Sequence, residues 1–249
     1  MAIEWSKKVC DCTYEVRSAG NTLRLYTNNV FHSQYNAKKP LQGGIWDLLS
    51  LPAFHFNHGE LQRILVLGVG GGTVLKQLQR YLMPHAIVGV EINPVHLKVA
   101  SQYFGVKHRS IELIEADAID WLSHYDGEKF DLIIDDLFGH NNNVAERVVN
   151  VNKQWTKHLL RNLNSKGMLV INFGDNKELN HCAMVSYKKL KQTFKSIVRL
   201  TLPAYENAIG VFSYKTIDTK KMRENCQQKL GLTTKLKKQQ LTYNIKKIK

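Results

Sequence analysis

Cysteine is scarce in this sequence, and no long apolar run is present. The four cysteines, Cys10, Cys12, Cys182 and Cys226, are too few and too scattered for a disulfide framework, so we expect reduced thiols. No stretch reaches the roughly 18 apolar residues of a membrane-spanning helix, and the first residues lack the apolar core of a signal peptide. We therefore expect a cytoplasmic protein with no membrane span.

Proline is also scarce, with five among 249 residues, and 43% of the residues are apolar. A chain of this length and composition can bury a full core and is typical of one α/β domain with a small appendage. The ten histidines form no metal-binding pattern: His55 and His58 lie close together, but no H-E-x-x-H or C-x-x-C motif accompanies them. No metal site is predicted.

Acidic residues are outnumbered, 21 against 35 basic ones, which gives a net charge of +14. From Lys215 to Lys249 there are eleven basic residues and only Asp218 and Glu224 as acids, so about +9 of this charge belongs to the tail. Such a tail can bind RNA, an acidic protein or an anionic surface, and a solvated tail without a partner is an equally good interpretation. Tyr243 is its only aromatic residue after Tyr214, too few for a base-stacking platform.

The stretch ILVLGVGGG, from Ile64 to Gly72, is the most informative part of the chain. Four apolar residues suited to a buried parallel strand run into a loop with four glycines in five positions, and the next residues to Tyr81 have a helical pattern. A glycine loop between strand and helix lets a nucleoside approach the backbone, although a plain strand-to-helix turn is the alternative. The predicted cofactor-binding glycines are Gly68, Gly70, Gly71 and Gly72.

The spacing of these glycines indicates which cofactor to expect. The dinucleotide motif G-x-G-x-x-G would need a glycine where Thr73 stands. The spacing G-x-G-x-G is satisfied instead, and it is common in proteins that bind S-adenosylmethionine. The loop therefore favours S-adenosylmethionine over a dinucleotide.

Strands and helices alternate along the rest of the chain. Predicted strands at 86–92, 111–116, 130–135 and 168–173 alternate with helices at 95–104, 118–125, from the polar loop 139–143 to about 162, and at 184–194. Two strands at 197–202 and 208–214 then form an antiparallel pair. The pattern predicts a Rossmann-like, doubly wound, mostly parallel sheet with helices on both faces, whose ligands bind at the carboxyl ends of the strands.

The two ends of the chain are predicted to be smaller appendages. Apolar and polar residues alternate over 9–16 and 22–30 around Ser18-Ala19-Gly20-Asn21, which predicts a small β-hairpin, and a short helix at 45–51 follows. The C-terminal segment is expected to be helical over 220–229 and then loosely ordered. The predicted units are residues 1–52, the cofactor-binding domain 53–215 and the basic tail 216–249.

Carboxylates stand at the end of successive predicted strands. Glu91 follows the glycines by about twenty residues, where a carboxylate can accept both ribose hydroxyls. Asp117 can accept the amine of an adenine while the Ala118 N–H meets a ring nitrogen. Of Asp135 and Asp136, strand alternation sends one toward the site, and we choose Asp136 because the loop begins there. Each acid taken alone could instead be solvated or cap a helix.

The motifs GVGGG, VEIN, EADAIDWL and FDLIIDD together resemble the spermidine synthase family and its methyltransferase-like relatives, over about residues 60–175. The resemblance implies a class I methyltransferase fold that binds S-adenosylmethionine or decarboxylated S-adenosylmethionine, with Glu91 on the ribose, Asp117 near the adenine, and Ile92 and Ala118 as further cofactor-binding residues. It also implies that the N-terminal hairpin is that family's small β domain, and that Gln34 contacts the cofactor.

The sequence departs from this family on the acceptor side. Polyamine synthases have a D-S-S-D motif after the fourth strand, whereas Asp136-Leu137-Phe138-Gly139 keeps only the first acid. A site with fewer carboxylates binds a polyamine cation less well. The acceptor, small molecule or protein, therefore stays open, and so does the oligomeric state, a homodimer included.

Three functional hypotheses follow. The first is transfer of a methyl group from S-adenosylmethionine, with Asp136 as the catalytic residue that positions or deprotonates the nucleophile. The second is an aminopropyltransferase that uses decarboxylated S-adenosylmethionine to make polyamines. The third is a non-catalytic module that binds RNA or an acidic protein through the basic tail.

Overall fold

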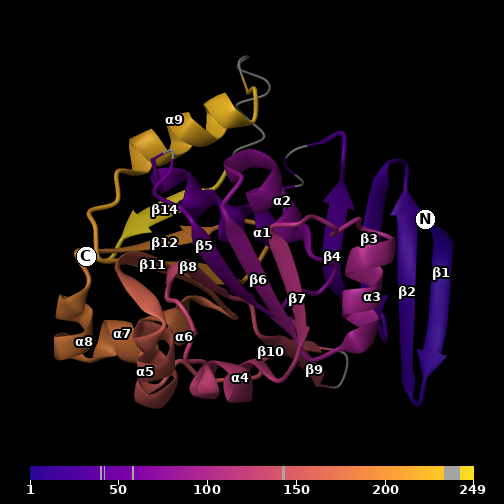
Figure 1. Ribbon diagram of the computed structural model, residues 1–249, viewed down its shortest axis with the longest axis horizontal. Helices are drawn as coiled ribbons and strands as arrows, with labels where there is room; N and C mark the ends of the chain where they lie inside the picture. The colour runs from indigo at the N-terminus through magenta and orange to yellow at the C-terminus, as the bar shows by residue number, and fades with distance from the viewer. Residues whose placement is uncertain (40, 42, 58, 142–143, 233–241) are drawn as a thin grey trace.

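An eight-stranded sheet forms the centre of the protein (Figure 1). The computed structural model describes residues 1–39, 41, 43–57, 59–141, 144–232 and 242–249. The strand order is β14-β12-β13-β11-β8-β5-β6-β7, parallel from β11 to β7 and antiparallel from β11 to β14. The strands are β5 (Arg63–Leu67), β6 (Ala86–Glu91), β7 (Ile111–Glu115), β8 (Phe130–Asp135), β11 (Leu163–Phe173), β12 (Ser196–Thr201), β13 (Ala208–Ser213) and β14 (Asn244–Lys247). The predicted Rossmann-like fold is confirmed.

Helices cover both faces of this sheet, because alternate residues of each buried strand point to opposite sides. On β5, Ile64 and Val66 pack with α1, α2, α3 and α9, whereas Leu65 and Leu67 pack with α4, α5, α6 and α7. The helices are α1 (Ile45–Ser50), the 3₁₀-helix η1 (Leu51–His55), α2 (Thr73–Leu82), α3 (Pro94–Gln102), α4 (Ala118–His124), α5 (Lys153–Arg161), α6 (Asn176–His181), α7 (Ala183–Ser186), α8 (Lys188–Thr193) and α9 (Thr219–Lys229). No described helix is long and apolar enough to cross a bilayer.

A separate antiparallel sheet precedes the central one and lies beside α3 (Figure 1). The predicted hairpin is its central pair, β2 (Cys12–Ala19) and β3 (Thr22–Thr27), and β1 (Ala2–Val9) and β4 (Val30–Asn36) extend it on either side. Thr27 Oγ1 lies 2.8 Å from His96 Nε2, and Ser33 Oγ accepts a 3.0 Å hydrogen bond from the Gly71 N–H. This small sheet is therefore attached to α3 and to the glycine loop.

A short hairpin occupies the segment where a loop and the start of a long helix were expected. Strands β9 (Phe138–Asn141) and β10 (Val144–Arg147) pair with each other, and helix α5 begins only at Lys153. The late start has a local cause, since the Asn152 side chain caps α5 by accepting from the Trp155 N–H at 2.9 Å. The predicted helix over 144–152 is therefore wrong.

The predicted helix over 184–194 is present but not continuous, because it is broken into α7 and α8 at Tyr187. The backbone of Tyr187 is extended, with φ −92° and ψ 115°. Just before the break, Ser186 Oγ donates to the carbonyl of Cys182 at 2.8 Å, a side-chain bond of the kind that bends helices.

The C-terminal segment is more ordered than predicted. The expected helix is present as α9, capped by Asp218, but β14 follows it and pairs antiparallel with β12. The expectation of a loosely ordered end is therefore wrong for 244–247. Residues 233–241, which carry three of the tail's lysines, lie outside the described residues.

Candidate active site

A cavity of about 730 Å³ lies at the carboxyl ends of the parallel strands. This volume is within the roughly 300–1,000 Å³ of small-molecule sites, and its position is where doubly wound sheets bind ligands. Four of its wall segments follow β5, β6, β7 and β8, and a fifth is the loop between β12 and β13. Of the residues predicted from sequence, it brings together Gly68, Gly70, Glu91, Ile92, Asp117, Ala118 and Asp136.

Three of the predicted cofactor contacts are not among the residues lining this cavity. The Gly71 N–H bonds to Ser33, and a Cβ at Gly72 would lie 2.5 Å from Val106 Cγ2. Gln34 accepts from Arg24 Nε at 3.0 Å through its side chain and from Thr73 Oγ1 at 2.8 Å through its carbonyl. In this structure these residues pack the small sheet and α3 against the glycine loop.

Gly68 brings the glycine loop directly against the end of β8. Its φ is +85°, and a Cβ would overlap the carbonyl oxygen of Asp136. Only glycine fits both the left-handed backbone and this close approach. The glycine at 68 therefore sets the position of Asp136 relative to the loop.

Replacing Gly68 with alanine is expected to lower the free energy of unfolding by about 2–4 kcal/mol, from left-handed strain plus overlap with the Asp136 carbonyl. Gly20→Ala is the matched control, because Gly20 also has a positive φ, +58°, but a Cβ there would have nothing within 4 Å. We expect the control to lose about 1 kcal/mol. Equal losses in urea unfolding of the two variants would contradict the close approach.

Glu91 holds the glycine loop through its side chain. Its Oε2 accepts from the N–H groups of Val69 and Gly70 at 3.0 and 2.9 Å, and Oε1 accepts from Asn93 at 3.0 Å. Burial disfavours the charged form, but the contact with His96 and the backbone donors outweigh it, so the pKa of Glu91 is lowered. A carboxylate has about four acceptor sites, and the three backbone N–H groups take three of them, so at most one is left for a ribose hydroxyl.

Asp117 and Ala118 form the start of α4 at the cavity wall. Asp117 Oδ1 accepts from the N–H groups of Ile119 and Asp120 at 2.7 and 3.2 Å, which makes it the helix N-cap. Asp117 therefore does cap a helix, which was the alternative interpretation of such an acid. The capping bonds use Oδ1 only, so Oδ2 is available to a ligand. The Ala118 N–H belongs to the first turn of α4, where helix geometry supplies no acceptor.

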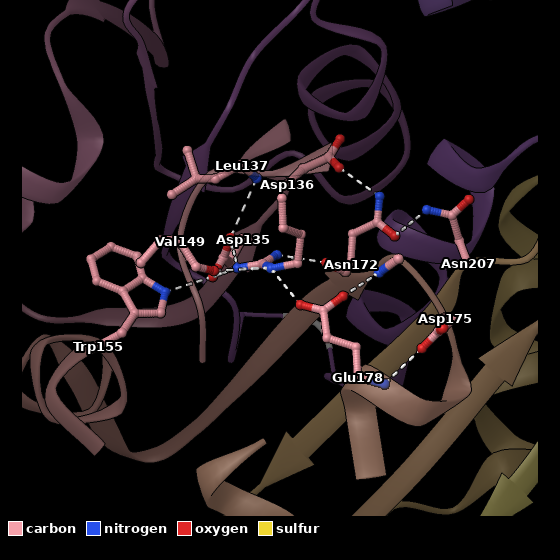
Figure 2. A network of polar contacts seen from close by, with 11 residues as sticks. Asp135, Asp136, Leu137, Val149, Trp155, Asn172, Asp175, Glu178 and Asn207 are labelled. Carbon is pink, nitrogen blue, oxygen red and sulfur yellow. Dashed lines mark hydrogen bonds and ion pairs between the residues drawn. The ribbon is translucent and has the colours of Figure 1, made fainter. Parts of the chain in front are cut away.

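Asp135 and Asp136 have different surroundings although they are adjacent (Figure 2). Asp135 is fully buried and accepts from Arg147 Nη2 at 3.0 and 3.1 Å and from Trp155 Nε1 at 2.8 Å. Asp136 lines the cavity, where its Oδ1 accepts from Asn172 Nδ2 at 2.7 Å. Of the two acids, Asp136 is therefore the one placed to meet a ligand, and its catalytic role stays a prediction.

The pKa of Asp136 is raised to about 6. Burial is the largest cause, and the negative charge of Asp135 adds to it, while the hydrogen bond from Asn172 and the charge of Arg147 oppose it. Half of the Asp136 carboxyl groups are therefore protonated near pH 6, and most are ionised near pH 7. A carboxylate with this pKa can accept a proton at neutral pH.

Arg147 is the centre of the polar network that contains Asp135. Its side chain is only 4% exposed and pairs with Asp135 and, at 3.3 Å, with Glu178. It also donates to the carbonyls of Asn172 and Val149 at 2.5 and 3.2 Å. Arg147 therefore ties the β9-β10 hairpin to β8, β11 and α6, and sequence analysis did not identify it.

The charges around the cavity have one sign. Among the described residues that line it, four are carboxylic acids and two are histidines, and none is lysine or arginine. The acids are Glu91, Asp117, Asp136 and Glu206. In a chain of net charge +14, this arrangement favours a cationic ligand over an anionic one.

Several lining residues were not predicted, among them Asn172, Glu206 and Asn207. Sequence carried a signal for the last two: strands 197–202 and 208–214 were expected to pair antiparallel, and the turn of such a pair lies at one edge of the sheet. The observed register, with Thr201 opposite Ala208, puts this turn at the carboxyl end of β11. No group of three potential metal ligands occurs among the described residues.

Comparison with known proteins supports the resemblance seen in the motifs. The chain is 26% identical over 202 residues to a polyamine aminopropyltransferase of Buchnera aphidicola, covering 77% of this chain and 68% of that protein. It is 24% identical over 159 residues to polyamine aminopropyltransferase 2 of Caldanaerobacter subterraneus, covering 61% of this chain and about half, 52%, of that relative.

Solved structures show the same fold. A probable spermidine synthase from Corynebacterium glutamicum aligns with a TM-score of 0.72 at 17% identity, covering 99% of this chain and 91% of that one. Human methyltransferase-like protein 13 in complex with SAH aligns with a TM-score of 0.59 at 19% identity, covering 75% and 91%. The family model described as "Spermine/spermidine synthase domain" matches residues 48–225, so the chain belongs to the spermine/spermidine synthase family.

Proposed function

We propose that this protein is an aminopropyltransferase that moves the aminopropyl group of decarboxylated S-adenosylmethionine onto an amine. The observation that carries the proposal is the cavity wall with four carboxylic acids and, among its described residues, no lysine or arginine. The donor and an amine acceptor are both cations, so this wall stabilises both. Two relatives named polyamine aminopropyltransferases support the same reaction.

Methyl transfer, which sequence analysis placed first, is less well supported. S-adenosylmethionine carries a carboxylate that its decarboxylated form lacks, and a carboxylate in this cavity would meet acidic side chains without a lysine or arginine from the described wall to offset them. The likeness to a human methyltransferase-like protein, at 19% identity, concerns the fold alone.

The site residues have separate tasks in this proposal. Glu91 accepts from a ribose hydroxyl, and Asp117 with the Ala118 N–H binds the adenine. The glycine loop and the small sheet fix these groups, because Glu91 accepts from the loop N–H groups and Ser33 binds Gly71. Orientation of this kind supplies a large part of the barrier reduction in a two-substrate reaction.

Asp136 serves the nucleophile. An amine acceptor is a cation at neutral pH, so its attacking nitrogen must first lose a proton, and the Asp136 carboxylate accepts that proton. The lone pair of the resulting neutral nitrogen attacks the aminopropyl carbon bound to the sulfonium sulfur, a carbon–nitrogen bond forms, and the carbon–sulfur bond breaks with its electron pair left on sulfur. The pKa of about 6 leaves Asp136 ionised and ready for this step at pH 7–8.

Calorimetry with decarboxylated S-adenosylmethionine and with S-adenosylmethionine tests the proposal. We expect the decarboxylated form to bind at least about tenfold more tightly. A repulsion of about 1.4 kcal/mol between the carboxylate of S-adenosylmethionine and the acids of the cavity wall is enough for that ratio. Glu91→Gln is expected to weaken both ligands alike. Incubation with amines, read by mass spectrometry, should give a product heavier by one aminopropyl group; methylated product from S-adenosylmethionine would overturn the proposal.

A further inference from the structure

A second cavity of about 730 Å³ lies between α5 and α8 and is called the basic cavity below. Helices α5, α7 and α8 lie together at one corner of the molecule (Figure 1). The described residues that line this cavity are all different from those that line the candidate active site. Its volume is within the roughly 300–1,000 Å³ of small-molecule sites, so it can hold a ligand of its own.

The charge of the basic cavity is opposite to that of the candidate active site. Of its nine described lining residues, five are basic and none is acidic. The basic residues are Lys153, Lys157, Arg161, Lys188 and Lys189. Neither α5 nor α8 contains an acid, and none of the five pairs with a described carboxylate. The protein thus leaves this positive charge without a described counter-charge, which favours an anionic ligand.

Three of these basic residues repeat every four positions along α5, at Lys153, Lys157 and Arg161. Residues four apart lie on one face of a helix, where like charges repel and destabilise it. An anion with several negative charges, placed along this face, replaces the repulsion with attraction. Arg161 Nη2 already donates to the Tyr125 carbonyl at 2.5 Å, so the lysines carry most of the free donor capacity. Lysines act as point charges and are common phosphate ligands.

Apolar side chains complete the wall of the basic cavity. Leu160 and Leu190 line it together with Tyr187, which stands at the break between α7 and α8. The Tyr187 side chain is 47% exposed, and Lys153 Nζ lies 3.9 Å from the centre of its ring. An exposed aromatic ring can pack against the flat face of any nucleobase. Positive charge and a stacking surface are therefore adjacent.

Thr156 adds a polar group that lacks a partner. It lines the basic cavity and is fully buried, and its Oγ1 makes no hydrogen bond to any described group. A buried hydroxyl without a partner is unfavourable, and an oxygen of a bound ligand can supply one. The wall thus combines unneutralised cations, an aromatic ring and an unsatisfied hydroxyl.

We propose that the basic cavity binds a nucleoside polyphosphate, with its phosphates against Lys153, Lys157 and the lysines of α8 and its base against Tyr187. A ligand with a single carboxylate would neutralise only a small part of the charge, and inorganic phosphate would leave the apolar wall without a contact. The volume suits one nucleotide and not a strand. This inference does not depend on the reaction proposed for the acidic cavity.

Calorimetry with GTP, inorganic triphosphate and guanosine tests the proposal. GTP is the probe in place of ATP because an adenine is proposed to bind in the acidic cavity. We expect the wild type to bind GTP about tenfold more tightly than triphosphate, and guanosine not at all. The double variant Lys153→Gln with Lys157→Gln should weaken GTP binding at least about tenfold.

Two further variants separate the contributions of charge and stacking. Lys98→Gln with Lys107→Gln changes the net charge equally at two exposed lysines outside the basic cavity, so GTP binding should stay within about twofold of the wild type. Tyr187→Ala should weaken GTP about fivefold and leave triphosphate within about twofold.

Four results would overturn the proposal. They are no binding of GTP by the wild type, equal weakening in the two double lysine variants, triphosphate bound as tightly as GTP, and guanosine bound as tightly as GTP. A single-stranded RNA that binds through Lys153 and Lys157 while GTP does not would assign this surface to nucleic acid, and would also overturn it.

Discussion

Replacing Asp136 with asparagine is expected to remove most of the transfer activity while making the folded protein more stable at neutral pH. The loss of a positioned base lowers the rate by about 10²-fold to 10⁴-fold. Asparagine keeps an oxygen that accepts from Asn172 but carries no charge. The variant thus removes the base but keeps an acceptor for the hydrogen bond from Asn172.

The gain in stability follows from the sign of the pKa shift. The pKa of Asp136 is raised from 3.8 to about 6, so the folded state binds the proton more tightly than the unfolded chain. Below about pH 3 both states are protonated and the charge costs nothing; as the pH rises from 3.8 to above 6 the folded protein loses at most about 3 kcal/mol. Asparagine avoids this loss, and we expect a gain of about 1–3 kcal/mol at pH 8 and almost none below about pH 3.

Urea unfolding at several pH values measures this difference, with Asp126→Asn as a control because Asp126 is an exposed acid outside the cavity. In the wild type, kcat/KM is also expected to rise with pH through about 6 as Asp136 ionises. A variant that loses activity and is destabilised at pH 8 would contradict a raised pKa for Asp136 in the folded protein.

Replacing Arg147 with methionine is expected to lower the free energy of unfolding by about 3–5 kcal/mol. The substitution leaves the fully buried carboxylate of Asp135 without its ion pair, although the Trp155 N–H still donates to it. It also frees the β9-β10 hairpin from β11 and α6, so the KM of an amine acceptor should rise as well.

The double variant Arg147→Met with Asp135→Asn separates charge from packing. Removing both charges should recover a large part of the loss, because the penalty of an unpaired buried charge disappears while the asparagine oxygen still accepts from Trp155. Guanidinium unfolding of both single variants and the double variant completes the cycle. Additive losses would show that Arg147 stabilises the hairpin by packing alone.

The parts of the fold that could be predicted are those with a local pattern. Continuous apolar runs identified β5 and β8. Strand alternation separated Asp135 from Asp136, and the start of the loop at Asp136 selected the acid that lies in the cavity wall. The β9-β10 hairpin could not be predicted because Arg147 binds groups such as Asp135 and Asn172 that are distant in sequence. Strand β14 was missed for the same reason, since it pairs with β12 far upstream.

The candidate site shows where a motif alone is misleading. Because glycine stands at position 139, where polyamine synthases have the second acid of the D-S-S-D motif, the sequence indicated too few carboxylates on the acceptor side. This favoured the hypothesis of methyl transfer. The fold brings Glu206 to the same cavity from a loop about 70 residues downstream, and a motif comparison confined to one strand end does not reveal it. Two of the four loop glycines, Gly71 and Gly72, are likewise not among the residues that line the cavity, a difference that the spacing of the glycines does not reveal.

The pairing of β14 with β12 bears on how the protein avoids aggregation. An outermost strand offers unpaired backbone groups to other chains, and short length and lysine side chains are common protections. β14 is four residues long, and its Lys246 and Lys247 are exposed. A second copy that approached β14 edge to edge would bring these positive charges together. The short length and the lysines of β14 therefore protect this edge of the sheet from pairing with a strand of another molecule.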